Sequence, residues 1–210
     1  MTVPVISLRA KKVVTAAIGA GRLVVVPDVG GYAAVVRADL DDASSRLAAR
    51  CSTTSSALCH LIGSIDQARA LAGDWSATTQ QLMVRCWPGA LTIVVPTDRA
   101  PGRISLRLPS SRPLRHLLRE SGPWLVAPLG LATVAEVLKT WAGDDHDHAV
   151  ACIVDGGHCA NPTPTVVDAT GPTLRTVEEG ALPTAFIEGA LLMGGRRRWF
   201  RSRAAAGDPR

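Results

Sequence analysis

The chain has 210 residues, 47% of them hydrophobic, and a formal net charge of +5. This length and composition suit one domain with or without a tail, and they exclude disorder of the whole chain. Charged residues interrupt every apolar run before it reaches 18 residues, so we expect no membrane span, no secretory signal and a cytoplasmic location. The five cysteines include no C-x-x-C pair, which predicts reduced thiols and no metal site.

The positive charge is unevenly distributed. Residues 196–210 contain six arginines against Asp208 alone, so residues 1–195 are formally neutral. We therefore expect a domain at 1–190 and a basic tail at 191–210. The tail pairs arginines with aromatic side chains, a combination typical of RNA binding, although a solubilising extension is the alternative. A second group of arginines lies between Arg99 and Arg119. The candidate RNA-binding residues are Arg103, Arg112, Arg115, Arg119, Arg196, Arg197, Arg198 and Trp199.

Apolar segments alternate between strand-like and helix-like periods along residues 1–190, which predicts an α/β domain. In the first half, strands are predicted at 3–6, 23–26, 32–36 and 57–62, and helices from Ser7 to about Ala20, at 41–50, from Ser64 onward and at 78–86. In the second half, strands are predicted at 91–95, 104–108, 125–127, 151–154 and 166–168, and helices at 112–120, 133–141 and 183–193. The short linker between 91–95 and 104–108 favours an antiparallel pair.

Phosphate-binding loops of the G-x-x-x-x-G-K-[ST] and G-x-G-x-x-G types do not occur in the sequence. Instead, three glycine- or proline-containing turns follow or precede strands, where free backbone amides can face a ligand. They are Pro27–Tyr32, Trp87–Thr92 and Asp155–Gly157. Each one alone is better explained as a tight turn.

The order of these turns and of the segments around them resembles the YrdC-like family. The resemblance covers residues 8–183 and is carried by Gly21–Pro27, Trp87–Val94, Ile104–Pro109, Asp155–Gly157 with Thr165–Asp168, and Glu179–Leu182. It implies a twisted mixed parallel and antiparallel sheet with flanking helices and an open concave face. It also implies synthesis of threonylcarbamoyl-adenylate from ATP, threonine and bicarbonate, with Mg²⁺, for tRNA threonylcarbamoyladenosine modification. The residues that match substrate or nucleotide contacts are Tyr32, His60, Thr92, Arg107 and Thr165.

Two of these residues have an alternative interpretation. Arg107 is either a ligand-facing arginine or a salt-bridged one at a strand edge, and His60 alternates with apolar residues as a packed histidine would.

The sequence departs from the family where the chemistry is expected. Asp28, Val29 and Gly30 replace the Thr-Asp-Thr of the signature P-T-D-T-x-Y-G-L, and the cations of K-x-R and the lysine after it fall on Ala49, Cys51 and Ser55. The S-x-N motif falls near 129–131, and a late arginine falls on Glu178, with Arg175 nearby. Because adenylate formation needs cations around phosphoryl oxygens, these losses predict slow or absent catalysis. Arg46 and Arg50 are candidate replacements, but a one-residue shift on a helix points elsewhere.

Three functions therefore remain open. The first is a divergent nucleotidyltransferase of the threonylcarbamoyl-adenylate synthase type. The second is a non-catalytic module that binds a nucleotide, tRNA or double-stranded RNA. The third is a pseudoenzyme that regulates a protein partner and whose vestigial pocket is filled by Leu129 and Leu131.

Overall fold

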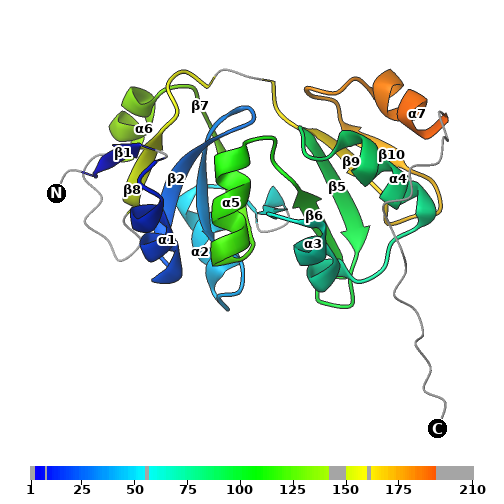
Figure 1. The fold of residues 1–210 in the computed structure, drawn as a ribbon, viewed down its shortest axis with the longest axis horizontal. Helices are drawn as coiled ribbons and strands as arrows, with labels where there is room; N and C mark the ends of the chain where they lie inside the picture. The colour runs from blue at the N-terminus through cyan, green and yellow to red at the C-terminus, as the bar shows by residue number, and fades with distance from the viewer. Residues whose placement is uncertain (1–2, 8, 55–56, 142–149, 160–161, 193–210) are drawn as a thin grey trace, which may run out of the picture.

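The computed structural model describes residues 3–7, 9–54, 57–141, 150–159 and 162–192. Figure 1 shows the fold. The predicted tail residues Arg196, Arg197, Arg198 and Trp199 and the K-x-R-related Ser55 lie outside the described residues. The strands in chain order are β1 (Val5–Ser7), β2 (Leu23–Asp28), β3 (Gly31–Arg37), β4 (Cys59–Leu61), β5 (Leu91–Pro96), β6 (Arg103–Arg107), β7 (Trp124–Leu131), β8 (Val150–Asp155), β9 (Thr165–Asp168) and β10 (Arg175–Glu178). The helices are α1 (Lys11–Gly19), α2 (Ala43–Arg50), α3 (Ile65–Ala72), α4 (Ala77–Cys86), α5 (Arg112–Ser121), α6 (Val134–Trp141) and α7 (Thr184–Leu192).

All the described strands belong to one sheet, in the order β1-β8-β2-β3-β7-β4-β6-β5-β9-β10. The pairs β1/β8, β2/β8, β4/β6 and β5/β9 are parallel, and the other five pairs are antiparallel. The expected mixed α/β sheet is therefore confirmed, including the antiparallel pairing of β5 with β6.

The two faces of this sheet are named here after neighbouring positions in the β4/β6 pair. His60 pairs with Leu106, and Leu61 pairs with Arg107. Because successive residues of a strand point to opposite faces, His60 and Arg107 lie on opposite sides of the sheet. We call these sides the His60 face and the Arg107 face.

Helices pack over both halves of the His60 face but over only one half of the Arg107 face. On the His60 face, α2 and α6 pack over β2, β3 and β7, while α3, α4 and α7 pack over β5, β6 and β9. On the Arg107 face, α1 and α5 pack over β2, β3 and β7. Over β5, β6 and β9 the Arg107 face carries Val94, Ser105 and Val166, which are only partly buried. Within the described residues, this half of the Arg107 face is open.

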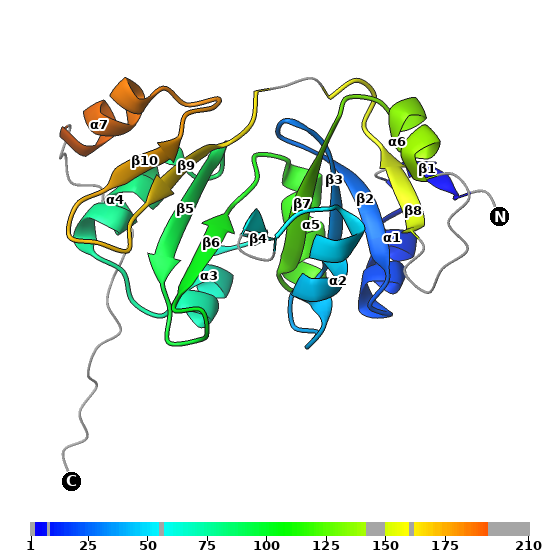
Figure 2. The same cartoon turned by 180° about the vertical axis from the view of Figure 1, so that it is seen from behind.

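The sheet is strongly twisted, as right-handed strand twist requires over so many strands. In Figure 2, α2 lies in front of the sheet and α4 behind it, although both pack against the His60 face. The twist therefore turns the open half of the Arg107 face toward the same side of the molecule as α2.

The structure differs from the sequence prediction at three elements. Ser7 does not cap the first helix, because it pairs with Asp155 in β1 and its carbonyl accepts the amide of Ala10 in a turn before α1. Strand β7 runs on to Leu131, beyond the predicted end at 127, and pairs with β3 along this extension. Strand β10 was not predicted, because it is a short, mostly exposed edge strand with no apolar pattern.

None of the helices in the described ranges is long and apolar enough to cross a membrane.

Candidate functional site

A tight hairpin places Asp28 at one end of the sheet. Strands β2 and β3 pair from Val24 with Val35 to Asp28 with Gly31, which leaves Val29 and Gly30 as the turn. Gly30 has a φ of 87° and Gly31 a φ of 126°, and a Cβ on Gly31 would lie 2.5 Å from the carbonyl oxygen of Leu131. Glycine is therefore required here, both for the backbone angles and for the close approach of β7.

Asp28 forms a buried, bidentate ion pair with Arg107 at the end of β6. Arg107 Nη1 donates to Asp28 Oδ1 over 2.9 Å, and Nη2 donates to Oδ2. The two side chains are 2% and 3% exposed. Burial alone would lower the pKa of Arg107, but the charge of Asp28 outweighs it and the pKa is raised. Of the two interpretations of Arg107, the structure shows the ion-paired one, in which the partner is Asp28.

Thr92 and Cys59 lie beside this pair on the Arg107 face. Thr92 of β5 is 6% exposed, and its side chain forms a hydrogen bond with the Cys59 thiol. Burial raises the pKa of that thiol to about 11, while Arg107 opposes the rise. The thiol is therefore protonated at neutral pH. Sequence reasoning missed the roles of Asp28 and Cys59, although the replacement of threonine by Asp28 in the signature was a signal.

His60 lies on the opposite face and is separated from Arg107 by the sheet. Burial lowers its pKa to about 4, and the charge of Arg99 adds to this effect. Its Nδ1 atom has no hydrogen-bond partner among the described residues. His60 is therefore a neutral, packed histidine that does not share a surface with Arg107 and Thr92.

Tyr32 also belongs to the His60 face, where it is almost fully buried in the core with α2 and α6. Its hydroxyl accepts a hydrogen bond from the Gly156 amide over 3.0 Å and donates one to the Gly157 carbonyl over 2.9 Å. Burial raises its pKa. Tyr32 thus fastens the Asp155–Gly157 turn to the β2–β3 hairpin.

Thr165 has a similar fastening role at the other half of the sheet. Its hydroxyl donates to the Leu182 carbonyl over 2.6 Å and accepts from the amides of Gly180 and Leu182. It is fully buried. The five predicted contact residues are therefore divided: Arg107 and Thr92 are neighbours, whereas Tyr32, His60 and Thr165 lie on the other face, and substrate contact stays a prediction for each.

The candidate replacement cations on α2 are already engaged. Arg46 donates to the carbonyl of Gly21 over 3.0 Å and to Asp42 over 3.4 Å. The guanidinium of Arg50 lies 4.1 Å from the centre of the Trp141 ring. Neither contact directs a positive charge toward Arg107, which agrees with the expectation that a one-residue shift points elsewhere.

The segment that replaces S-x-N does not fill a pocket on the Arg107 face. Leu129 and Leu131 pack against the core cluster that contains Tyr32, whereas Pro128 and Gly130 are exposed. The alternation of β7 thus sends both leucines to the His60 face.

Three of the predicted RNA-binding arginines gather on one side of α5. Arg112, Arg115 and Arg119 are spaced by three and four residues, so they share a helix face. Burial lowers the pKa of Arg115, and the charges of Arg119 and Arg112 lower it further, which shows that the three cations are close. Arg103 lies apart from them at the start of β6, where its charge acts on Asp168.

Comparison with known proteins shows the family of this chain. The model of the Sua5/YciO/YrdC family, described as "Telomere recombination", matches residues 16–180. A putative threonylcarbamoyl-AMP synthase of Mycobacterium tuberculosis is 30% identical over 198 residues, covering 85% of this chain and 88% of the relative. The threonylcarbamoyl-AMP synthase of Bacillus subtilis is 30% identical over 139 residues, covering 56% of this chain and 40% of that protein.

Solved structures show the same fold. P. abyssi Sua5 complexed with L-threonine superposes with a TM-score of 0.79 at 22% identity, over 90% of this chain and 61% of that protein. E. coli YciO superposes with a TM-score of 0.73 at 20% identity, over 86% of this chain and 96% of that protein. The chain thus spans about three fifths of the Sua5 protein. The chain belongs to the Sua5/YciO/YrdC family, the YrdC-like family that includes the threonylcarbamoyl-AMP synthases.

Proposed function

We propose that this chain is a divergent relative of threonylcarbamoyl-AMP synthase that binds a nucleotide or RNA in tRNA threonylcarbamoyladenosine modification, while adenylate formation itself is slow or lost. The observation that carries this proposal is the buried ion pair of Asp28 and Arg107. An arginine whose charge is already balanced by a carboxylate does not stabilise charge that develops on a substrate.

The surroundings of the pair support the same conclusion. The positions of the family's K-x-R cations hold Ala49 and Cys51, and Arg46 and Arg50 are engaged elsewhere. Loss of a single stabilising group costs on the order of 100-fold or more in rate. Several losses together leave the scaffold without the charges that adenylate formation needs.

ATP would bring Mg²⁺ with its phosphates if the reaction persists, because such sites use one or two carboxylates plus phosphate oxygens. The donor set of the described residues does not fit a protein-held ion. Asp28, the buried carboxylate at this end of the sheet, is engaged by Arg107, and the described residues hold no cluster of three metal-ligating side chains.

The open half of the Arg107 face suits binding better than catalysis. Val94, Ser105 and Val166 form a neutral, partly buried surface there. Beyond them, Asp168 forms an ion pair with Arg175 over 3.5 Å and also interacts with the charge of Arg103. Such a surface can accept a base or another planar group, but it offers little to a triphosphate.

A second candidate function, RNA binding without any role in adenylate chemistry, is favoured by the arginines of α5. Arg112, Arg115 and Arg119 lie close together and form no ion pair with a described residue, and the contacts of Arg115 and Arg119 are to the neutral backbone carbonyls of Pro109, Ser110 and Gly63. Clustered cations that lack acidic partners attract phosphate groups. The protein partner considered from the sequence has no such supporting observation.

Pyrophosphate release tests the main proposal. Purified protein is incubated with ATP, Mg²⁺, bicarbonate and threonine beside the Bacillus subtilis enzyme. The control is Asp28→Leu/Arg107→Met, in which no buried charge is left unpaired. We expect threonine-dependent release at least about 100-fold slower than in the reference enzyme. Release at a comparable rate that the double variant abolishes would show that the chain is an active synthase.

A further inference from the structure

The ion pair of Asp28 and Arg107 has the geometry of a ligand in a binding site. Both carboxylate oxygens of Asp28 face the two Nη atoms of Arg107, which is the arrangement by which arginine recognises carboxylates in general. Asp28 reaches this position from the last residue of β2, 79 positions away in the sequence. The chain thus supplies an internal carboxylate where a bound anion would lie.

Arg107 offers more hydrogen-bonding capacity than Asp28 uses. Its Nε atom is buried and has no hydrogen-bond partner among the described residues. The hydroxyl of Thr92 and the thiol of Cys59 lie beside the guanidinium on the same face. Buried donors are normally satisfied, so an unsatisfied one next to a charge pair indicates a position built for an additional or different acceptor.

The open half of the Arg107 face adjoins this pair. Thr92, which lies beside Arg107, pairs across the sheet with Val166 of β9, and Val166 is only partly buried. A position vacated by the Asp28 carboxylate would therefore border the open half of the Arg107 face.

We propose that the Arg107 guanidinium is a binding position for a small oxyanion, a carboxylate or bicarbonate, and that Asp28 is its built-in occupant and competitor. A carboxylate attached to the chain is present at a high effective concentration, so it displaces a free anion of the same chemistry. Asp28 is then a specificity-determining residue: its presence closes the position to anions and its removal opens it.

This position is part of the site described under the proposed function. The inference rests on that proposed function, because both assign Arg107 to ligand binding. Its test measures anion binding without ATP. A protein that releases no pyrophosphate can therefore still bind the anion. A protein that binds no anion leaves the conclusion from pyrophosphate release unchanged.

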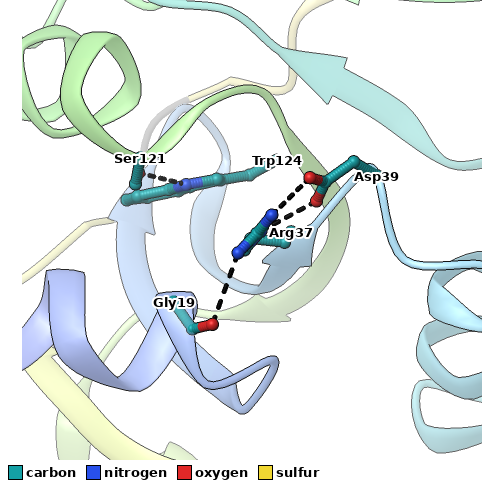
Figure 3. A network of polar contacts seen from close by, with 5 residues as sticks. All are labelled: Gly19, Arg37, Asp39, Ser121 and Trp124. Carbon is teal, nitrogen blue, oxygen red and sulfur yellow. Dashed lines mark hydrogen bonds and ion pairs between the residues drawn. The ribbon is translucent and has the colours of Figure 1, made fainter.

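The test is a melting titration of Asp28→Ala with sodium formate, which replaces the deleted carboxylate. Sodium chloride keeps the ionic strength constant, and bicarbonate and L-threonine form separate titrations. The matched control is Asp39→Ala, which breaks an exposed bidentate pair with Arg37 at the far end of β3. Figure 3 shows this pair, with Arg37 also directed at the Gly19 carbonyl. A second control, Asp28→Ala/Arg107→Met, removes the guanidinium.

We expect formate to raise the melting midpoint of Asp28→Ala, with an affinity at least tenfold higher than for the wild type or for Asp39→Ala, because a ligand that binds only the folded state stabilises it. The double variant should not respond. A response to bicarbonate but not to threonine identifies a bicarbonate-sized position, and a response to threonine identifies one that reaches the open face. Both support the proposal.

Equal responses of Asp28→Ala and the wild type would overturn the proposal, as would a response that persists in the double variant. Should Asp28→Ala fail to fold in chloride, the same titration of Asp28→Asn decides, since its amide removes the charge but still accepts a hydrogen bond from Arg107. The proposal would then be overturned if formate raised the melting midpoint of Asp28→Asn no more than that of the wild type.

Discussion

The Tyr32 hydroxyl and the Gly156 amide are 124 positions apart in the sequence but 3.0 Å apart in the structure. The same hydroxyl donates to the Gly157 carbonyl, so one side chain bonds two backbone groups of the turn that follows β8. This bridge holds the turn against Pro27, the residue before Asp28.

Tyr32→Phe should therefore destabilise the protein and loosen this turn. The two lost hydrogen bonds are partly buried, and an ordinary hydrogen bond of this kind contributes about 0.5–1.5 kcal/mol to stability. We expect urea unfolding to show a loss in this range and hydrogen exchange to speed up at Gly156 and Gly157. Trp124→Phe, which removes the 2.8 Å bond from Trp124 Nε1 to Ser121 Oγ, is the control, and it should leave exchange at the turn unchanged. Unchanged exchange in Tyr32→Phe would contradict the fastening role.

The buried pair should be strongly coupled in stability. Arg107→Met leaves the Asp28 carboxylate buried without a partner, which costs about 3–5 kcal/mol. Asp28→Leu/Arg107→Met removes both charges and should be clearly more stable than Arg107→Met, because paired charges replaced by apolar groups are often neutral for stability. Urea unfolding of the wild type, the two single variants and the double variant gives the coupling. Additive losses would show that the two side chains do not interact.

His60 should make stability depend on pH between its unfolded and folded pKa values. The unfolded value is 6.5 and burial lowers the folded value to about 4, so the unfolded chain binds the proton first. Stability is then full above pH 6.5, falls as the pH drops toward 4, and is constant below that. The total effect is on the order of 3 kcal/mol.

The measurement is urea unfolding of the wild type and His60→Gln from pH 7.5 to 4. Carboxylates titrate in both proteins, so their contribution cancels in the difference. We expect the difference in unfolding free energy to change in favour of His60→Gln as the pH falls. A difference that is constant over this range would mean that His60 is not held neutral by burial.

The arginines of α5 should dominate any RNA affinity of the described domain. Replacing Arg112, Arg115 and Arg119 with glutamine should weaken binding to a tRNA-like RNA and reduce the slope of log affinity against log salt by about 2–3. The control variant replaces three other basic residues with glutamine and so removes the same charge: Lys11, Lys12 and Arg22, which lie on and after α1. Fluorescence anisotropy at several salt concentrations gives both values. Equal losses in the two variants would indicate a general charge effect.

Deletion of residues 196–210 tests the tail separately. The sequence predicts that it lowers both the RNA affinity and its salt dependence, because six arginines are removed with Trp199 and Phe200. Unchanged binding would assign any RNA contact to the α5 arginines.

The local pattern of residues determined most of the secondary structure of this protein. Alternating apolar periods located nearly all the helices and strands, since side-chain spacing within one element depends only on neighbouring residues. Ser64, Ser76 and Ser111 each cap a helix through the side-chain oxygen, as such residues do at helix starts. The order of short motifs was enough to indicate the family, and the missing cations were visible as Ala49 and Cys51.

Tertiary structure decided how the candidate residues combine. Tyr32, His60, Thr92, Arg107 and Thr165 were grouped by sequence, but strand register places Thr92 and Arg107 on one face and the others on the opposite face. In the sequence, Asp28 indicated only the loss of a threonine of the family signature, whereas in the structure it forms an ion pair with Arg107. Both results depend on pairing between strands far apart in the chain, and a shift of register by one residue would exchange the two faces.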